Sequence, residues 1–274
     1  MEQPMLTILT PTFDRRHTLP RLYDSLCAQA RHDFEWLVVD DGSTDDTAQW
    51  VRACRPRTGF QVRVLRQDNS GKHVALNTGV QAARGEWVFI VDSDDWLTPD
   101  AVECVAAALA QAADRPQQVA GVCFRKAGPD GGLRGRPYAG PVPFIGTPSQ
   151  VGRMVQGDLA YVFRRDLMAA LPFPVIPGEK FVPELYIWNR IADRGQIRFH
   201  LDRAVYHCEY LADGYTRNFQ AQLRRSPGGF LLFYAEQIGR EPHWTGRIKA
   251  AVRSLQCLAY CVAKARADRR GPRA

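Results

Sequence analysis

The chain has 274 residues, enough for one large domain or two small ones, and its 45% hydrophobic and 24% charged residues exclude a disordered chain. The formal net charge of +7, from 36 Lys and Arg against 29 Asp and Glu, favours anionic partners. Charge alone does not choose among nucleotides, phosphates, nucleic acid and anionic membranes.

The seven cysteines are scattered, and no two have CxxC spacing. This usage predicts buried reduced thiols rather than disulfides or a zinc site, and hence a cytoplasmic location. The N-terminal stretch MEQPMLTILTPTFDRR carries an acid and no long apolar core, so we expect no signal peptide. No window approaches the ~20 apolar residues that span a bilayer.

Short apolar strands alternate with amphipathic helices through the first hundred residues. We expect strands at 6–9, 36–39, 62–65, 87–91 and 119–124. We expect helices at 18–30, 73–83 and 99–113, and Thr18 could cap the first of them. A further helix should begin after a cap at Ser43 or Thr44 and continue through Val51. This order predicts an α/β fold, a Rossmann-like, mostly parallel sheet with helices on both faces.

The pattern weakens after residue 124. Residues 128–148, dense in Gly and Pro, predict a long loop or an irregular hairpin. Mixed structure is expected over 158–215, with a helix at 186–192 and one or two strands within 197–207. Beyond residue 220 the chain is expected to be a helical extension.

Polar residues follow three of the expected strands, at Pro11–Asp14, Asp40–Ser43 and Asp92–Asp95. The carboxyl ends of parallel strands form the ligand-binding edge of such sheets, so these segments should converge. Either acid of Asp40-Asp41 could accept hydrogen bonds from a base or a ribose, although DGS is also good turn chemistry.

The stretch VFIVDSDDWLTPD places three carboxylates within four positions at a strand end. Like charges this close destabilise a fold unless they are neutralised. A divalent cation with oxygen ligands, Mg²⁺ or Mn²⁺, held by Asp92 and Asp94, would neutralise them. The alternative is a solvated acidic turn in which Asp95 caps a helix.

Lys72 lies in NSGKH, just before an expected helix, where a lysine is well placed for a phosphate. The segment is not a P-loop, because Arg66 and His73 stand where that motif requires Gly and Ser or Thr.

Four motifs in order, TPTFDR, VVDDGSTDDT, GKHVALNTG and VDSDDWLTPDA, resemble a family 2 glycosyltransferase of the GT-A fold over residues 5–105. Asp14 departs from the family's usual Asn, which bears on hydrogen bonding more than on the fold. The resemblance implies a nucleotide-diphosphate sugar donor, with a UDP-sugar favoured, Mn²⁺ or Mg²⁺ as cofactor, and an acceptor glycan or glycolipid.

The resemblance also implies roles for individual residues. Donor binding is assigned to Pro11, Phe13, Asp14, Asp41, Lys72, Asp92, Ser93 and Arg217, and metal binding to Asp94, Asp92 and His207. By this resemblance Asp94 would be the main metal ligand. His207 at a strand end also suits a structural role, and Arg217 also suits an ordinary surface arginine.

The catalytic base is expected in GEKFVPELYIWNRIADRG. The family often has a Glu-Asp pair before a Trp-containing helix, and here Glu184 is followed by Leu185. The spacing to Trp188 favours Glu184, although a first-turn Glu also stabilises a helix. Glu179 and Asp158 are the fallback bases.

These roles divide the chain into a nucleotide-sugar-binding half at 1–115, an acceptor-binding half of the same domain at 116–220, and the helical extension at 221–274. The apolar stripe expected within residues 247–267 has basic flanks. Such a helix could lie on the inner face of an anionic membrane, or it could pack on the domain.

Two other functions stay open, a nucleotidyltransferase of similar fold and a non-catalytic sugar-nucleotide-binding module. A nucleic-acid partner is not expected, because the positive charge is dispersed and no recognition module occurs. No oligomeric state follows from the sequence.

Overall fold

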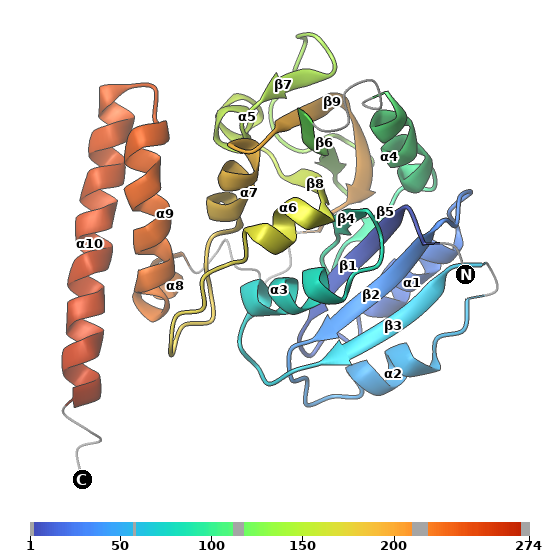
Figure 1. Ribbon diagram of the computed structural model, residues 1–274, viewed down its shortest axis with the longest axis horizontal. Coiled ribbons are helices and arrows are strands. Elements are labelled where there is room, and N and C mark those ends of the chain that lie inside the picture. Colours follow the sequence, from blue (N-terminus) through green and yellow to red (C-terminus); the bar gives the residue numbers. More distant parts are fainter. Residues whose placement is uncertain (1–2, 57–58, 112–117, 210–218, 270–274) are drawn as a thin grey trace. The chain divides into compact units, whose positions relative to one another are not determined.

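The computed structural model describes residues 3–56, 59–111, 118–209 and 219–269. The chain forms two compact units. Unit 1 comprises Met1–Pro172 and Trp188–Glu209, and unit 2 comprises Phe173–Ile187 and Tyr210–Ala274. The sheet belongs to unit 1 and the C-terminal helices to unit 2 (Figure 1). The expected division at residues 115 and 220 stays a prediction.

One nine-stranded sheet lies in unit 1. Its strands are β1 (Leu6–Thr12), β2 (Phe34–Asp40), β3 (Gln61–Arg66), β4 (Trp87–Ile90), β5 (Trp96–Leu97), β6 (Val119–Ala127), β7 (Phe144–Gly146), β8 (Leu159–Arg164) and β9 (Gln196–His207). Their order is β3-β2-β1-β4-β8-β6-β9-β5, with β7 beside β9. The run from β3 to β4 is parallel, as is the β6–β9 pair, and β8 is antiparallel to β4 and β6. The predicted α/β class is confirmed.

Helices cover the central strands on both faces. The helices within the described residues are α1 (Leu19–Cys27), α2 (Thr47–Ala53), α3 (Lys72–Ala82), α4 (Ala101–Ala110), α5 (Pro148–Val155), α6 (Arg165–Ala170), α7 (Glu184–Ala192), α8 (Phe219–Arg225), α9 (Pro227–Arg240) and α10 (Trp244–Arg269). Of these, α8, α9 and α10 belong to unit 2 rather than to the unit that holds the sheet. Every residue of β1 and β2 is buried, as a sheet covered on both faces requires. Helix α3 packs closely on β1 at Gly79, where an added Cβ atom would lie only 2.2 Å from Leu9 Cδ1.

The first strand is longer than the sequence indicated, because Pro11 lies inside β1 and pairs with Val39. Leu9 O accepts from Val91 N, so Leu9 and Pro11 direct their backbone polar groups toward β4. The β1–β4 ladder stops at Leu9 and Ile90. The missing N–H of Pro11 therefore falls beyond the end of β4, where no ladder hydrogen bond is lost.

The two expected helix caps are wrong in detail. Thr18 stands before α1, but its hydroxyl donates to Arg15 O at 3.2 Å and caps no helical N–H. The second helix begins at Thr47 rather than after Ser43 or Thr44. The amide of Thr44 is bonded to Asp14 Oδ1 at 2.7 Å, which holds this segment as a loop.

Several elements in the second half were not specified by the sequence. The Gly- and Pro-rich segment 128–148 contains β7, and the region 158–215 contains β8 and α6 before the expected α7. Residues 196–207 form a single strand, β9, with irregular pairing to β6.

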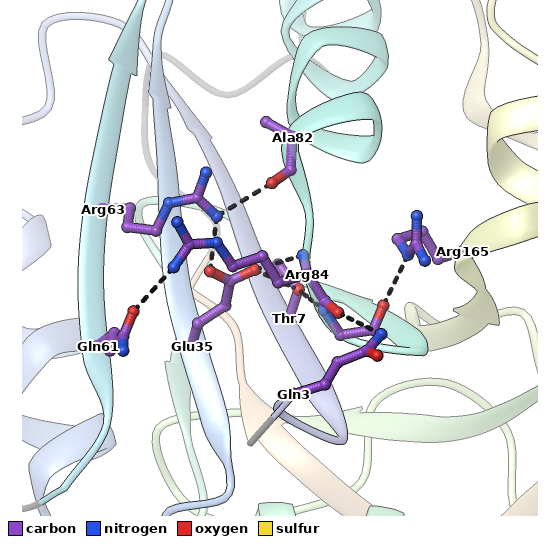
Figure 2. A network of polar contacts seen from close by, with 9 residues as sticks. Gln3, Thr7, Glu35, Gln61, Arg63, Ala82, Arg84 and Arg165 are labelled. Carbon is purple, nitrogen blue, oxygen red and sulfur yellow. Dashed lines mark hydrogen bonds and ion pairs between the residues drawn. The ribbon is translucent and has the colours of Figure 1, made fainter. Parts of the chain in front are cut away.

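The amino-terminal edge of the parallel strands is closed by a polar network around the buried Glu35 (Figure 2). Its Oε1 accepts from Thr7 Oγ1 and Arg84 N, both at 2.7 Å, and its Oε2 accepts from Arg63 at 2.7 Å. Arg84 also donates to Gln61 at 3.0 Å. Because both carboxylate oxygens of the buried Glu35 have partners, we interpret the network as structural.

Unit 2 has a small core of its own, built from Leu223, Phe230 and Cys257 of α8, α9 and α10, with Phe181 packed against it. None of the helices within the described ranges is long and apolar enough to cross a membrane. All seven cysteines are free thiols, and five of them are buried, which fits the predicted reduced state.

Candidate active site

The three polar segments predicted to converge lie at one edge of the sheet. They follow β1, β2 and β4, and these strands are parallel neighbours in the order β2-β1-β4. Backbone hydrogen bonds tie the strand ends together: Asp41 N donates to Thr12 O at 2.8 Å, and Val91 N donates to Leu9 O at 3.0 Å. The expectation of a shared carboxyl edge is confirmed.

The Asp92 carboxylate is held by two lysines. Oδ1 lies 2.5 Å from Nζ of Lys72, the first residue of α3, and Oδ2 lies 3.6 Å from Nζ of Lys126 on β6. Burial favours the neutral acid, but the two ammonium groups outweigh it and hold the pKa of Asp92 well below its usual range. The acidic cluster therefore has protein partners in addition to the expected cation.

Lys126 is a site residue that the sequence reasoning missed. Its Nζ lies 3.0 Å from Asp95 Oδ2 and 4.3 Å from the centre of the Tyr206 ring, and the side chain is only 10% exposed. Burial raises the pKa of Asp95 to about 7, with Lys126 opposing the shift and Asp92 adding to it. The signal available in the sequence was a lysine two residues after the apolar run VAGVCF, just past the strand expected at 119–124.

Asp94 is in a less favourable environment than Asp92. Burial raises the pKa of the Asp94 carboxyl, the charge of Asp92 raises it further, and Arg15 and Lys72 oppose the shift only in part. The Asp94 carbonyl accepts from Arg21 at 2.8 Å, which fixes the backbone of this turn. A bound cation would relieve the electrostatic cost of ionising Asp94.

Asp41 organises the segment that leads into α3. Its Oδ1 accepts from Gln67 Nε2 and Ser70 N, both at 2.8 Å, and its Oδ2 accepts from Gly71 N at 2.7 Å. Gly71 has φ 97°, in the region that favours glycine, and directly precedes Lys72. A carboxylate has about four lone-pair sites, so one stays available to a ligand. The nucleoside-binding role of Asp41 stays a prediction.

Asp14 joins the end of β1 to the loop after β2. Its Oδ1 accepts from Thr44 N at 2.7 Å and from Asp45 N at 3.4 Å, and its own N donates to Ser43 Oγ at 2.9 Å. Its φ of 51° lies in the left-handed region, which Asp and Asn tolerate better than most residues. These contacts explain why either residue type suits this position. They give Asp14 a positioning role, and its predicted contact with the donor stays a prediction.

The other predicted donor residues differ in exposure. Phe13 is 43% exposed at the end of β1, where an aromatic ring could stack on a base. Pro11 and Ser93 are buried. Pro11 therefore supports the site from inside the sheet, and the direct donor contacts of all three residues stay predictions.

His207 is the last residue of β9. It pairs with Trp96, which lies two residues after Asp94 in the sequence. The two rings stack with centroids 5.2 Å apart, and Nδ1 of His207 lies 2.8 Å from Gly128 O. Arg21 also packs on Trp96, with its guanidinium carbon 3.7 Å from the ring centre. A carbonyl contact of this kind orients many metal-binding histidines, but it also suits a structural histidine, so the ligand role stays a prediction.

Glu184 is the half-buried first residue of α7. One turn later, Trp188 is buried, with its ring 4.9 Å from the Phe163 ring of β8. Asn189 accepts from Ser149 N at 3.2 Å and donates to Ser149 Oγ at 2.8 Å. The Trp-containing helix is present as predicted, and the base role of Glu184 stays a prediction.

Glu179, a fallback base, has a structural role in unit 2. Its Oε1 accepts from Gly228 N at 2.9 Å and its Oε2 accepts from Gly229 N at 3.0 Å, at the first turn of α9. Nζ of Lys264 lies 4.0 Å from the same carboxylate. These contacts satisfy helix amides that have no partner within the helix, which argues against Glu179 as the base.

The predicted roles of Asp158 and Arg217 stay predictions. Asp158 lies before β8, where its carbonyl accepts from Lys126 N at 3.1 Å and its Oδ2 lies 3.9 Å from Cys208 Sγ. Arg217 lies outside the described residues.

The acids at the end of β4 fit a divalent cation that binds together with its substrate. Carboxylate oxygens of Asp92 and Asp94 are hard ligands of the kind that Mg²⁺ and Mn²⁺ prefer. In the part of the chain that the structure describes, no group of three or more His, Cys, Asp or Glu could hold a metal. A cation held mainly by Asp92 and Asp94 would keep coordination positions for diphosphate and water.

A sheet of this order, with paired acids after β4 and helices on both faces, has the architecture of the GT-A glycosyltransferases. The glycosyl transferase family 2 model matches residues 7–164, more than half of the chain. The chain belongs to glycosyl transferase family 2.

A curated relative supports the same assignment over about a third of the chain. The PGL/p-HBAD biosynthesis glycosyltransferase of Mycobacterium bovis is 36% identical over 97 residues. The match covers 35% of this chain and 38% of that protein, so the chain matches well under two thirds of the relative's length.

Solved structures extend the likeness of fold to nearly the whole chain. Staphylococcus aureus TarS, residues 1–349 in complex with UDP-GlcNAc, has a TM-score of 0.63 and 20% identity, covering 93% of this chain and 72% of that one. A mannosyltransferase from Pyrobaculum calidifontis in complex with GDP-Man and Mn²⁺ has a TM-score of 0.59 and 21% identity, covering 97% and 76%.

Proposed function

We propose that this chain is a metal-dependent, inverting glycosyltransferase that moves a sugar from a nucleotide-diphosphate sugar, with a UDP-sugar favoured, to a hydroxyl of a glycan or glycolipid acceptor. The product would serve polysaccharide, glycolipid or other glycoconjugate synthesis. The observation that carries the proposal is the placement of Asp92 and Asp94 after β4, beside Lys72 at the start of α3, on the edge that also holds Asp41.

The donor would bind along this edge. The exposed Phe13 ring offers a stacking surface for the base, and the remaining lone pair of Asp41 offers an acceptor for a base N–H. The ammonium of Lys72 would then contact the diphosphate, as lysines beside helix N-termini do. Arg217 would be a second diphosphate contact.

Asp94 would be the principal metal ligand, with Asp92 beside it and His207 as a third candidate. A bound Mn²⁺ or Mg²⁺ would supply neutralisation of the charge that develops on the leaving diphosphate. The solved GT-A neighbour that contains GDP-Man and Mn²⁺ supports a divalent metal for the fold, without distinguishing the two ions.

Transfer would be a single displacement at the anomeric carbon. The acceptor oxygen forms a bond to this carbon while the bond to the diphosphate oxygen breaks, and the nucleoside diphosphate leaves with the electron pair. Glu184 would take the acceptor's proton. Attack from the face opposite the leaving group inverts the anomeric centre.

We also propose a cytoplasmic location, which the seven free thiols support. A thermal-shift screen of UDP-, GDP- and dTDP-sugars with Mn²⁺ tests the donor class, because a preferential ligand raises the melting temperature with its occupancy. In the parent chain one nucleotide class should stabilise more than the others. Asp94→Ala should keep its fold but lose the Mn²⁺-dependent stabilisation and sugar transfer, and full transfer by this variant would refute the metal assignment.

A further inference from the structure

Helix α10 carries an apolar stripe that faces away from the rest of unit 2. Its large side chains are 44% to 72% exposed and recur every three or four residues, at Trp244, Ile248, Val252, Leu255, Leu258 and Val262. Residues at this spacing share one face of a helix. Trp244 and Val262 are separated by about 27 Å along the axis, at 1.5 Å per residue. We call this surface the α10 stripe.

The opposite face of α10 packs against the other helices of unit 2. Cys257 and Ala250 are buried there, and Cys257 belongs to the core shared with α8 and α9. Lys264 donates from this side to Gly178 O at 2.9 Å and to Arg225 O at 3.2 Å. The α10 stripe is therefore not needed to hold the three helices together.

Positive charge borders the α10 stripe. Arg247 and Lys249 are exposed in the first two turns of α10, and Arg266 is exposed one turn beyond Val262. No Asp or Glu occurs from Trp244 through Ala267. A broad apolar face with a tryptophan and basic borders is typical of helices that lie in the plane of a membrane surface.

We propose that the α10 stripe docks on the surface of an anionic lipid bilayer, with the helix parallel to the membrane plane. Charge complementarity favours this occupant over a second copy of the chain. Two copies joined through the stripe would bring their exposed cations together, with no acid between Trp244 and Ala267 of either helix to pair with them. This inference does not depend on the proposed transfer reaction.

Vesicle flotation of the full chain tests the proposal. The vesicles contain phosphatidylcholine with 30% phosphatidylglycerol, or phosphatidylcholine alone. The parent chain should float with the anionic vesicles. Leu255→Glu, at the centre of the stripe, should reduce the bound fraction at least about tenfold, since it places a charge in the buried face. Ala267→Glu is the matched control, because it adds the same charge to exposed α10 surface off the stripe, and it should stay within about threefold of the parent.

Lys249→Gln tests the electrostatic contribution to membrane binding, and it should weaken binding to anionic vesicles about fivefold. Circular dichroism and thermal melting should be unchanged in each variant, because the substituted side chains are exposed. Equal flotation of the parent and Leu255→Glu, or no flotation of the parent, would overturn the proposal. Conversion of a parent dimer to a monomer by Leu255→Glu, without vesicle binding, would also overturn it and assign the stripe to a second copy.

Discussion

The Lys72 ammonium nitrogen lies 2.5 Å from Oδ1 of Asp92. This ion pair joins the first residue of α3 to the acids that follow β4. A metal ion and a donor diphosphate at the same edge would each attract one member of the pair. Lys72 would then exchange the Asp92 carboxylate for phosphate oxygens of the donor.

Lys72→Met should weaken binding of the nucleotide-sugar donor about 10- to 100-fold, because it removes a charge-assisted contact worth about 1.5–3 kcal/mol. The measurement is calorimetric titration with the best donor from the thermal-shift screen. Lys249→Met, an exposed lysine of unit 2, serves as the control. Unchanged donor affinity in Lys72→Met would show that the lysine has no contact with the diphosphate.

Lys126→Met should lower the free energy of unfolding by about 1–3 kcal/mol, because it leaves the buried Asp95 without its hydrogen-bonded cation, and proton uptake by Asp95 limits the loss. Urea denaturation measures this change. The double variant Lys126→Met with Asp95→Asn should recover much of the loss, since it removes the buried acid that has lost its partner. A loss below about 1 kcal/mol in the single variant, as for an ordinary surface change, would contradict the buried pair.

These contacts show where prediction from the sequence succeeded and where it stopped. The parallel core and its carboxyl edge could be predicted, because apolar runs and turn residues are local patterns that fix strand ends. Lys126 could not be placed beside Asp95, because β6 reaches β4 only through β8 and no local pattern records that order. The neutralisation of the acids was therefore assigned wholly to a cation, whereas lysines from α3 and β6 share it.

Glu179 illustrates the same limit within unit 2. It lies only five residues before Glu184, but its partners lie on α9, roughly fifty residues along the chain. Glu179→Ala should lower the free energy of unfolding by about 1–2 kcal/mol, as loss of a helix cap does. Urea denaturation measures the change, and a normal unfolding curve would contradict the capping role. The transfer rate of the folded variant should equal that of the parent.

Glu184→Gln should impair sugar transfer and leave stability unchanged, the reverse of what is expected for Glu179→Ala. The turnover number should fall about 10²- to 10⁴-fold, the range for loss of a general base, while donor affinity and melting temperature stay at parental values. Steady-state kinetics with a fixed acceptor measures the change, and Glu179→Ala is the matched comparison. Transfer at the parental rate would place the base elsewhere.

The most direct test of the central claim is calorimetric titration of UDP into the parent chain and Asp94→Asn, each with Mn²⁺ and with a chelator. In the parent, Mn²⁺ should tighten UDP binding by at least about tenfold, or about 1.4 kcal/mol. In Asp94→Asn this gain should disappear while the melting temperature of the free protein is unchanged. Equal UDP affinity in the parent with and without Mn²⁺, or a full Mn²⁺ effect in Asp94→Asn, would contradict a metal–diphosphate site anchored by Asp94.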